Sequence, residues 1–269
     1  MAYNKYTVQK KQVSNDNGLT WQDVSPLETR QGEFIDSYET LSQCEAIPYS
    51  EQYLTFVAEA DNMTVGLTLA YNNIFQYSTD SGATWSNLTN NGRTTSVNSG
   101  ETIMFKATGL GINNGIGSLR VSVNASVQGN VMSLVYGDNF IGQTEISNYQ
   151  FMGLFAASNI TSAENLILPA TTLKQHCYAE MFSTCERLTT APVLPATTLV
   201  NSCYYTMFLA CTNLNYIKCL ATSGFEAYQC TDSWVFGVAA SGTFVKDANA
   251  TWTTGTSGIP SGWTVQNNS

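Results

Sequence analysis

A histidine and a cysteine next to each other in the sequence are the residues that come closest to a catalytic pair. His176 precedes Cys177, and a histidine base beside a cysteine could generate a nucleophilic thiolate. Neighbouring residues of a helix point to different faces, however, and no third residue is evident that would orient the imidazole. We therefore expect His176 to lie at the solvent edge between two structural repeats, and we predict that the chain is not an enzyme.

Two other groups of residues could bind a metal ion. The run Asp16-Asn17-Gly18 resembles the start of a calcium loop, but it lacks the alternating carboxylates and the closing glutamate of such loops. The cysteines contain no C-x-x-C pair, which is ordinary zinc spacing. The sequence thus predicts a turn at Asp16, no metal site and no cofactor. A solvated face is expected for the acidic residues of the N-terminal segment, Glu28, Glu33, Asp36 and Glu39.

Charge and hydropathy exclude several classes of partner. The chain has 11 Lys and Arg against 20 Asp and Glu, which gives a formal net charge of −9. Binding to nucleic-acid phosphates needs a basic stripe, so dispersed arginines predict no nucleic-acid partner. No apolar run reaches the roughly 18 residues of a membrane span, which predicts no membrane insertion. The arginines are Arg30, Arg93, Arg120 and Arg187.

The N-terminus and the cysteines indicate whether the chain is exported from the cell in which it is made. The first 14 residues are polar and lack the apolar stretch of a secretion signal, so we expect no export by that route. The cysteine count of seven is odd, and five of the cysteines recur at repeat spacing in the C-terminal half. A thiol nucleophile or a metal ligand is the alternative, but this spacing favours reduced thiols buried in a repeat core.

A 26-residue repeat is the clearest internal pattern. The series Cys-Tyr-x-x-Met-Phe-x-x-Cys-x-x-Leu begins at Cys177 and again at Cys203, and a degenerate third copy begins near Phe151. A period of this length with leucine at fixed places is typical of a leucine-rich solenoid. The spacing i, i+4, i+8 predicts a short helix with one buried face, followed by a short strand. The expected repeat core comprises Cys177, Met181, Phe182, Cys185, Leu188, Cys203, Met207, Phe208, Cys211 and Leu214.

Short apolar segments separated by Asn, Gly, Ser and Asp turns precede the repeats. Their spacing, without a helical period between them, predicts an antiparallel β-sandwich. We expect strands at 53–58, 63–70, 74–77, 102–107, 119–127 and 131–136, and a C-terminal β cap with strands at 234–238, 243–246 and 263–266. The predicted domains are an N-terminal anchoring segment, the sandwich, the solenoid and the cap, at 1–45, 46–140, 141–228 and 229–269.

An eight-residue pattern, Ser-x-Asp-x-Gly-x-Thr-Trp, occurs twice. In a hairpin of this kind the Asp accepts hydrogen bonds from turn N–H groups, the Gly adopts positive φ and the Trp packs back over the turn. The pattern resembles the Asp-box, a structural hairpin motif of sialidases and many other β proteins. Sialidases also use an arginine cluster, which this chain does not supply. The motif residues are Ser14, Asp16, Gly18 and Trp21 in one copy and Ser78, Asp80, Gly82 and Trp85 in the other.

The repeat, with Leu-Pro-Ala-Thr-Thr-Leu at 168–173 and 194–199, is similar to the BspA-type leucine-rich repeats of gut Bacteroidales surface proteins and of the phages that infect them. Segments 129–140 and 258–265 resemble sequences that flank such repeats. Residues 6–30 resemble a module of structural proteins of crAss-like phages. The expected fold is mainly β with a short α/β repeat: an N-terminal β-hairpin arm, an antiparallel immunoglobulin-like β-sandwich and a short leucine-rich-repeat solenoid with a β cap.

Two functions follow from the resemblance. A virion structural protein, such as a head or tail fibre component, is made in the bacterial cytoplasm and needs no export signal. It would bind other virion proteins through residues 1–45 and present the repeats to a host glycan or surface protein, with self-association into a homo-oligomer left open. The alternative is a BspA-like adhesion protein at the bacterial cell surface, which should carry a secretion signal. Abundant Tyr, Asn, Thr and Ser suit recognition in either case.

Overall fold

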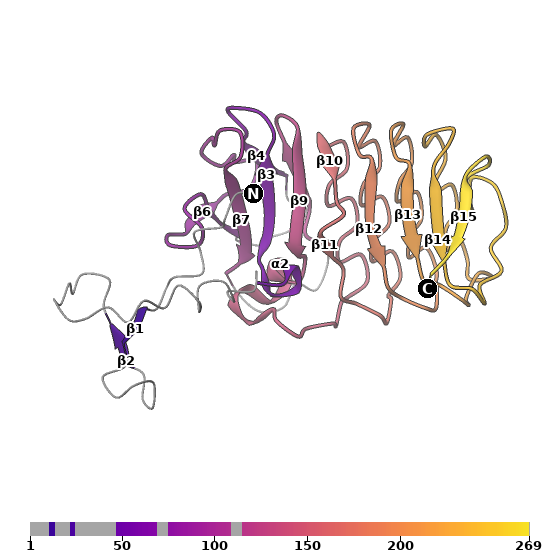
Figure 1. Ribbon diagram of the computed structural model, residues 1–269, viewed down its shortest axis with the longest axis horizontal. Helices are drawn as coiled ribbons and strands as arrows, with labels where there is room; N and C mark the ends of the chain where they lie inside the picture. Colours follow the sequence, from indigo (N-terminus) through magenta and orange to yellow (C-terminus); the bar gives the residue numbers. More distant parts are fainter. Residues whose placement is uncertain (1–10, 14–21, 25–46, 69–74, 109–114, 269) are drawn as a thin grey trace. The chain divides into compact units, whose positions relative to one another are not determined.

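The computed structural model describes residues 11–13, 22–24, 47–68, 75–108 and 115–268, in a chain that divides into two compact units (Figure 1). The first unit, Met1–Pro48, contains strands β1 (Lys11–Val13) and β2 (Gln22–Val24), which pair antiparallel. The motif copy at 14–21, with Ser14, Asp16, Gly18 and Trp21, lies outside the described residues.

The second unit, Tyr49–Ser269, is built on one large mixed sheet. Its strands pair antiparallel from β6 to β9 and parallel from β9 to β15. The order is β6 (Ser86–Leu88), β5 (Phe75–Ser78), β7 (Thr102–Ala107), β3 (Leu54–Ala58), β9 (Ala125–Asn130), β10 (Ile160–Ser162), β12 (Thr190–Leu194), β13 (Tyr216–Cys219), β14 (Thr243–Lys246) and β15 (Thr264–Asn267), with β11 (Leu166–Ile167) also paired to β9. A separate antiparallel pair is formed by β4 (Val65–Thr68) and β8 (Ser118–Val121).

The protein is mainly β, as its sequence predicts. Strand β7 shows why: its residues are alternately half-buried and buried, the period-two pattern of a strand with one face on the core. The sheet runs without a break from the antiparallel strands into the parallel ones, so positions 140 and 228 both lie inside the second unit. Among the described residues, no helix has the length and apolar content needed to span a membrane.

The segment at 131–136 was expected to be a strand, and that expectation is wrong. Residues 133–136 form a helical turn, α2 (Ser133–Tyr136), followed by the 3-10 turn η3 (Gly137–Asn139). The hydroxyl of Ser133 donates to the carbonyl of Phe105 at 2.9 Å and accepts from the N–H of Leu54 at 3.0 Å, which ties this turn to β7 and β3. Five of the six residues at 131–136 are buried, and Ser133 is among them, so no alternation of polar and apolar residues separates a helix from a strand in this short run.

The helix predicted for each repeat is replaced by a series of tight turns. We call each structural repeat, a series of turns followed by one strand of the parallel sheet, a coil. In the coil that contains Cys177, the backbone is left-handed at His176, Glu180 and Thr184, every fourth residue. A four-residue turn repeat places residues i, i+4 and i+8 on one face, as a helix nearly does, so the spacing alone could not separate the two. The same left-handed positions recur in the neighbouring coils at Tyr149, Gly153 and Ala157, at Ser202, Thr206 and Ala210, and at Gln229, Ser233 and Gly237.

Alternate N–H groups of these turns bond in two directions. The N–H of Met181 donates to Tyr178 within its own turn at 3.3 Å, whereas the N–H of Phe182 donates to the carbonyl of Met207 in the next coil at 2.9 Å. The same alternation links Tyr204 to Cys230 at 2.9 Å. Each coil is therefore hydrogen-bonded to its neighbours twice, through the parallel sheet and through this turn ladder, and Figure 1 shows the coils stacked side by side.

Aromatic side chains stack between the coils and form the core. One column has ring-centroid spacings of 5.6, 6.1 and 6.2 Å and consists of Phe151, Tyr178, Tyr204 and Trp234. All ten residues of the expected repeat core are 0% exposed, including Met181, Leu188 and Leu214. Fully burying a side chain of this size stabilises the fold by about 1.5–3 kcal/mol relative to leaving it exposed.

A fourth coil at the C-terminal end was not predicted from the sequence. The segment at 234–238 was expected to be a strand of the cap, but residues 228–237 form turns that continue the ladder. Trp234 follows the left-handed residue Ser233 and so stands at the place of the methionine in the earlier coils; its N–H donates to the carbonyl of Thr231 within the turn, as that of Met207 does to Tyr204. The expected cap strand at 243–246 is present as β14, and β15 lies one residue beyond the expected range of 263–266.

Candidate functional site

The only histidine lies beside another ring rather than in a catalytic pair. The imidazole of His176 stacks on the ring of Tyr149 in the preceding coil, with centroids 4.8 Å apart and an interplanar angle of 12°. Cys177 points into the core, and burial raises the pKa of its thiol to about 12. A thiol with this pKa is protonated at neutral pH, so the position does not supply a nucleophile.

The cysteines of the second unit are small core residues. All six are free and buried, and burial raises the pKa of each, to about 12 for Cys185 and Cys219. The thiols of Cys185 and Cys211 donate to the carbonyls of Phe155 and Phe182, each at 3.0 Å. In the part of the chain that the structure describes, no three His, Cys, Asp or Glu side chains are placed to share a metal ion. The remaining cysteines of the set are Cys177, Cys203 and Cys230.

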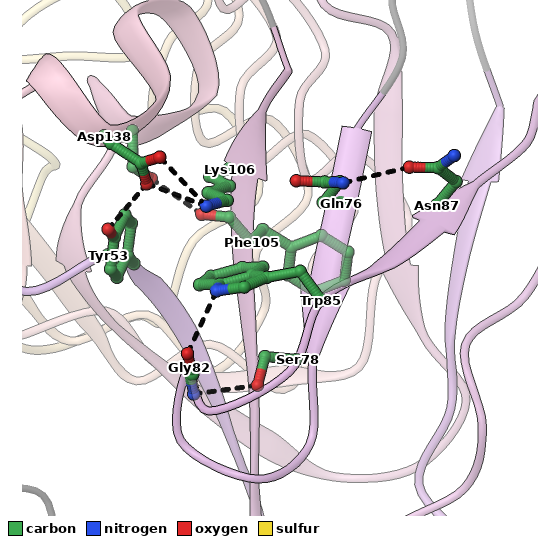
Figure 2. Close-up of polar contacts among 10 residues, drawn as sticks. Tyr53, Gln76, Ser78, Gly82, Trp85, Asn87, Phe105, Lys106 and Asp138 are labelled. Atoms are coloured by element: carbon green, nitrogen blue, oxygen red, sulfur yellow. Dashed lines mark hydrogen bonds and ion pairs between the residues drawn. The ribbon is translucent and has the colours of Figure 1, made fainter.

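The motif copy at 78–85 closes the hairpin between β5 and β6 (Figure 2). The Asp80 carboxylate accepts from the Thr84 hydroxyl at 2.6 Å, from the Thr84 N–H at 2.9 Å and from the Ser78 hydroxyl at 2.7 Å. These bonds, led by the one from the Thr84 hydroxyl, lower the pKa of Asp80 to about 2. The N–H of Gly82, where φ is +86°, donates to Ser78 at 2.8 Å. Both oxygens of this carboxylate therefore accept hydrogen bonds from residues of the turn.

Trp85 fastens the hairpin to the sheet. Its indole N–H donates to the carbonyl of Gly82 at 3.1 Å, and its ring meets the ring of Tyr53 edge-on at 5.1 Å. The Lys106 ammonium lies over the indole, 4.3 Å from its centroid, and forms an ion pair with Asp138 at 2.8 Å (Figure 2). We call Tyr53, Trp85, Lys106 and Asp138 the Trp85 clamp.

The Trp85 clamp joins four separate segments through satisfied polar groups. The Tyr53 hydroxyl donates to the Asp138 carboxylate at 2.8 Å, and burial together with this bond raises the pKa of Tyr53. The hydrogen bond from Lys106 is the main cause that lowers the pKa of Asp138. The Lys106 side chain is only 11% exposed, so its ammonium is occupied by the pair. The arrangement fixes the hairpin, β3, β7 and η3 together, and it leaves the outer side of Asp138, which is 63% exposed, open to solvent.

Hydroxyl side chains follow one another across the parallel half of the sheet. Each lies opposite the next in register and is at least partly exposed, while neighbours such as Ala125, Ile217 and Phe244 are buried. Adjacent strands lie about 4.8 Å apart, so the groups are regularly spaced. We call this set the hydroxyl row; it consists of Ser126, Ser162, Thr190, Tyr216, Thr243 and Thr264.

The hydroxyl row and the Trp85 clamp could not be found from the sequence. Period-two alternation in 102–107 places Lys106 on the face opposite the core, but its contacts with Tyr53, Trp85 and Asp138 depend on which strands are neighbours. The same holds for the row, because its members come from six strands whose order only the structure gives.

Comparison of the chain with protein-family models, with curated proteins and with solved structures gives no match.

Proposed function

We propose that the chain is a non-enzymatic structural protein of a phage particle, a head or tail fibre component that presents its sheet to a host glycan or surface protein. The observation that carries the proposal is the hydroxyl row on a sheet shared by antiparallel strands and stacked coils. In this proposal the coils are leucine-rich repeats of the BspA type, and the antiparallel strands belong to an immunoglobulin-like sandwich.

The chemistry of the hydroxyl row suits recognition. Each hydroxyl both donates and accepts hydrogen bonds, and it rotates to suit its partner. Six such groups on six adjacent strands offer a repeating polar surface to a chain of hydroxyl-bearing units such as a glycan. Tyr216 adds an aromatic ring within the row, and rings of this kind supply contact area at low entropy cost.

Several reactive groups among the described residues are held in structural roles, which supports the non-enzymatic part of the proposal. The thiols are buried and protonated, the Asp80 carboxylate is bound within its turn, and Lys106 is paired with Asp138. A scaffold of doubly hydrogen-bonded coils supports a display role, because it holds surface side chains at fixed spacing.

Attachment to other virion proteins is assigned to the N-terminal segment, residues 1–45. Its support is the division of the chain, in which Met1–Pro48 is a unit of its own with a two-stranded hairpin. A two-stranded hairpin is marginally stable in water, so a partner that covers it would stabilise it.

Binding of the labelled protein to host cells tests the recognition surface. The variant T190E/T243E places two carboxylates in the hydroxyl row and is expected to lower binding at least about tenfold, since desolvating unpaired charges opposes contact. The matched control T171E/T172E adds the same charge at two exposed positions outside the row and should bind as the unaltered protein does. Equal binding by both variants would contradict the proposal.

A bacterial cell-surface adhesion protein is the second candidate, favoured by the BspA-type repeat itself. The same surface would then recognise its ligand from the cell envelope rather than from a particle. Fractionation separates the two: the adhesion protein co-sediments with the envelope of uninfected cells, and the virion protein with purified phage.

A further inference from the structure

We propose that two copies of this chain associate through strand β15, with the two strands antiparallel and a two-fold axis passing through Gln266. The association does not depend on the proposed function. Closed two-fold contacts between identical surfaces are the commonest form of protein self-association.

Strand β15 has one hydrogen-bonding edge in use. Among the described strands it pairs only with β14, and all four of its residues are exposed. The N–H of Thr264 donates to Gly242 at 2.8 Å and the N–H of Asn268 to Lys246 at 2.7 Å. Backbone groups alternate in direction along a strand, so Val265 and Asn267 turn their N–H and C=O groups toward the other edge. That edge is a template for a further strand.

The edge carries none of the features that keep sheets apart. Natural edge strands are usually protected by Lys, Pro or inward-pointing charges, whereas β15 reads Thr-Val-Gln-Asn. Residues 248–269 contain no Asp, Glu, Lys or Arg, although the chain carries a net charge of −9. The charged residue in register with β15, Lys246 on β14, turns its ammonium to the carbonyls of Asp247 and Ala250. Two copies can therefore bring their β15 strands together without repulsion between charges on the strands themselves, and we assign the edge to a second copy.

The apolar surface at this edge also supports association with a second copy. Val265 is in register with Phe244 and Ile217, both 0% exposed, and yet it is itself 45% exposed. It extends the core-facing side of the sheet by one strand and leaves close to half of its own surface exposed. A neighbouring copy of β15 would continue this side and bury the valine.

The free groups fix the register of the association. With the two-fold axis at Gln266, Val265 lies opposite Asn267 of the second copy, and Asn267 lies opposite Val265 of the second copy. Both residues direct their backbone groups outward, so each of these two pairs exchanges both hydrogen bonds of a closely bonded antiparallel pair. Side chains of directly opposed residues also lie on the same face and in contact.

Two double variants that differ in the sign of one charge test this register. V265E/N267E places like charges opposite each other in both pairs, and we expect its dimer dissociation constant to rise at least about tenfold. V265K/N267E places opposite charges in both pairs and should dimerise at least as well as the unaltered chain. The control T171E/T172E adds the charge of the first variant far along the sequence and should leave dimerisation unchanged.

Sedimentation velocity of the full chain over a concentration series measures the dissociation constants, and circular dichroism with a melting curve verifies that every variant is folded. The expected result is a dimer for the unaltered chain, T171E/T172E and V265K/N267E, and a monomer for V265E/N267E at the same concentration. A monomeric unaltered chain, a larger assembly, or equal behaviour of the two position-265 variants would overturn the proposal.

Discussion

At the scale of single residues, the ionisation of Asp80 depends on one hydroxyl. The Thr84 side chain makes the largest contribution to holding the pKa of Asp80 at about 2. Thr84→Val removes that donor, so we expect the pKa of Asp80 to rise toward its ordinary value of 3.8. A carboxyl-detected NMR titration measures it. Ser86→Ala, at an exposed residue just beyond the hairpin turn, serves as the control and should leave the pKa near 2.

The sign of the pH effect follows from the lowered pKa. A carboxyl whose pKa is lower in the folded state stabilises the fold above its unfolded pKa, and this stabilisation disappears as the pH falls through the folded value. The contribution of Asp80 is therefore complete above about pH 4 and is lost toward pH 2. An Asp80 pKa that stays near 2 in Thr84→Val would contradict the role given to the hydroxyl.

The buried thiols give the opposite pH dependence. Burial raises the pKa of Cys177, Cys185 and Cys219 from 9.0 to about 12, so the folded chain retains protons that the unfolded chain loses. Stability is expected to decline as the pH rises from about 9 to about 12. Thiol counting with a disulfide reagent should detect seven thiols in denaturant and none of the six buried ones in the native protein at pH 8. Two or more disulfides in fresh protein would contradict this prediction.

At the scale of elements, the coil stack depends on side chains enclosed between coils. Met207 is 0% exposed, and the carbonyl of its backbone accepts from Phe182 in the preceding coil. Met207→Asp places an unpaired carboxylate in this interior and should lower the free energy of unfolding by about 3–5 kcal/mol. Met207→Leu keeps the volume and should cost less than about 1.5 kcal/mol. Chemical denaturation measures both, and a shared midpoint would contradict the stacked-coil arrangement.

The left-handed turn positions allow the turn ladder to be tested with a substitution that should stabilise the protein. Ala210 has φ of +58°, a conformation that costs an L-residue about 1–2 kcal/mol and glycine little. After the added flexibility of glycine in the unfolded chain, Ala210→Gly should raise the free energy of unfolding by about 0.5–1 kcal/mol. Ala179→Gly, at a buried turn residue outside the left-handed positions, should lower it. Equal effects of the two glycine substitutions would mean that the turns are helical.

The elements also show what the sequence could and could not predict. Strand 102–107 was predictable from its period-two alternation, and strand 243–246 from a short apolar pair between turn residues, because both are local signals. The turns of the repeat were predicted as helices because residues four apart share a face in both structures. The fourth coil was missed because Trp234 and Val235 replace the repeated Met-Phe pair and the leucine pattern has ended. Pairing across the Trp85 clamp depends on sheet order, which no local pattern encodes.

At the scale of the whole molecule, one unit carries the sheet and another carries the hairpin of β1 and β2. If residues 1–45 serve assembly alone, the remainder at 46–269 should fold with an unchanged melting transition, because its sheet and core lie within Tyr49–Ser269. Loss of that transition on truncation would mean that the first segment completes the core.

Quantitative mass spectrometry of purified phage particles tests the central claim most directly. Particles are prepared from host cells that supply either the full chain or residues 46–269 alone, and peptides from the shared region are counted against the major capsid protein. We expect a fixed copy number per particle for the full chain and none for the truncated one. Recovery of the full chain in the envelope of uninfected cells, with none in purified particles, would contradict the assignment to the virion.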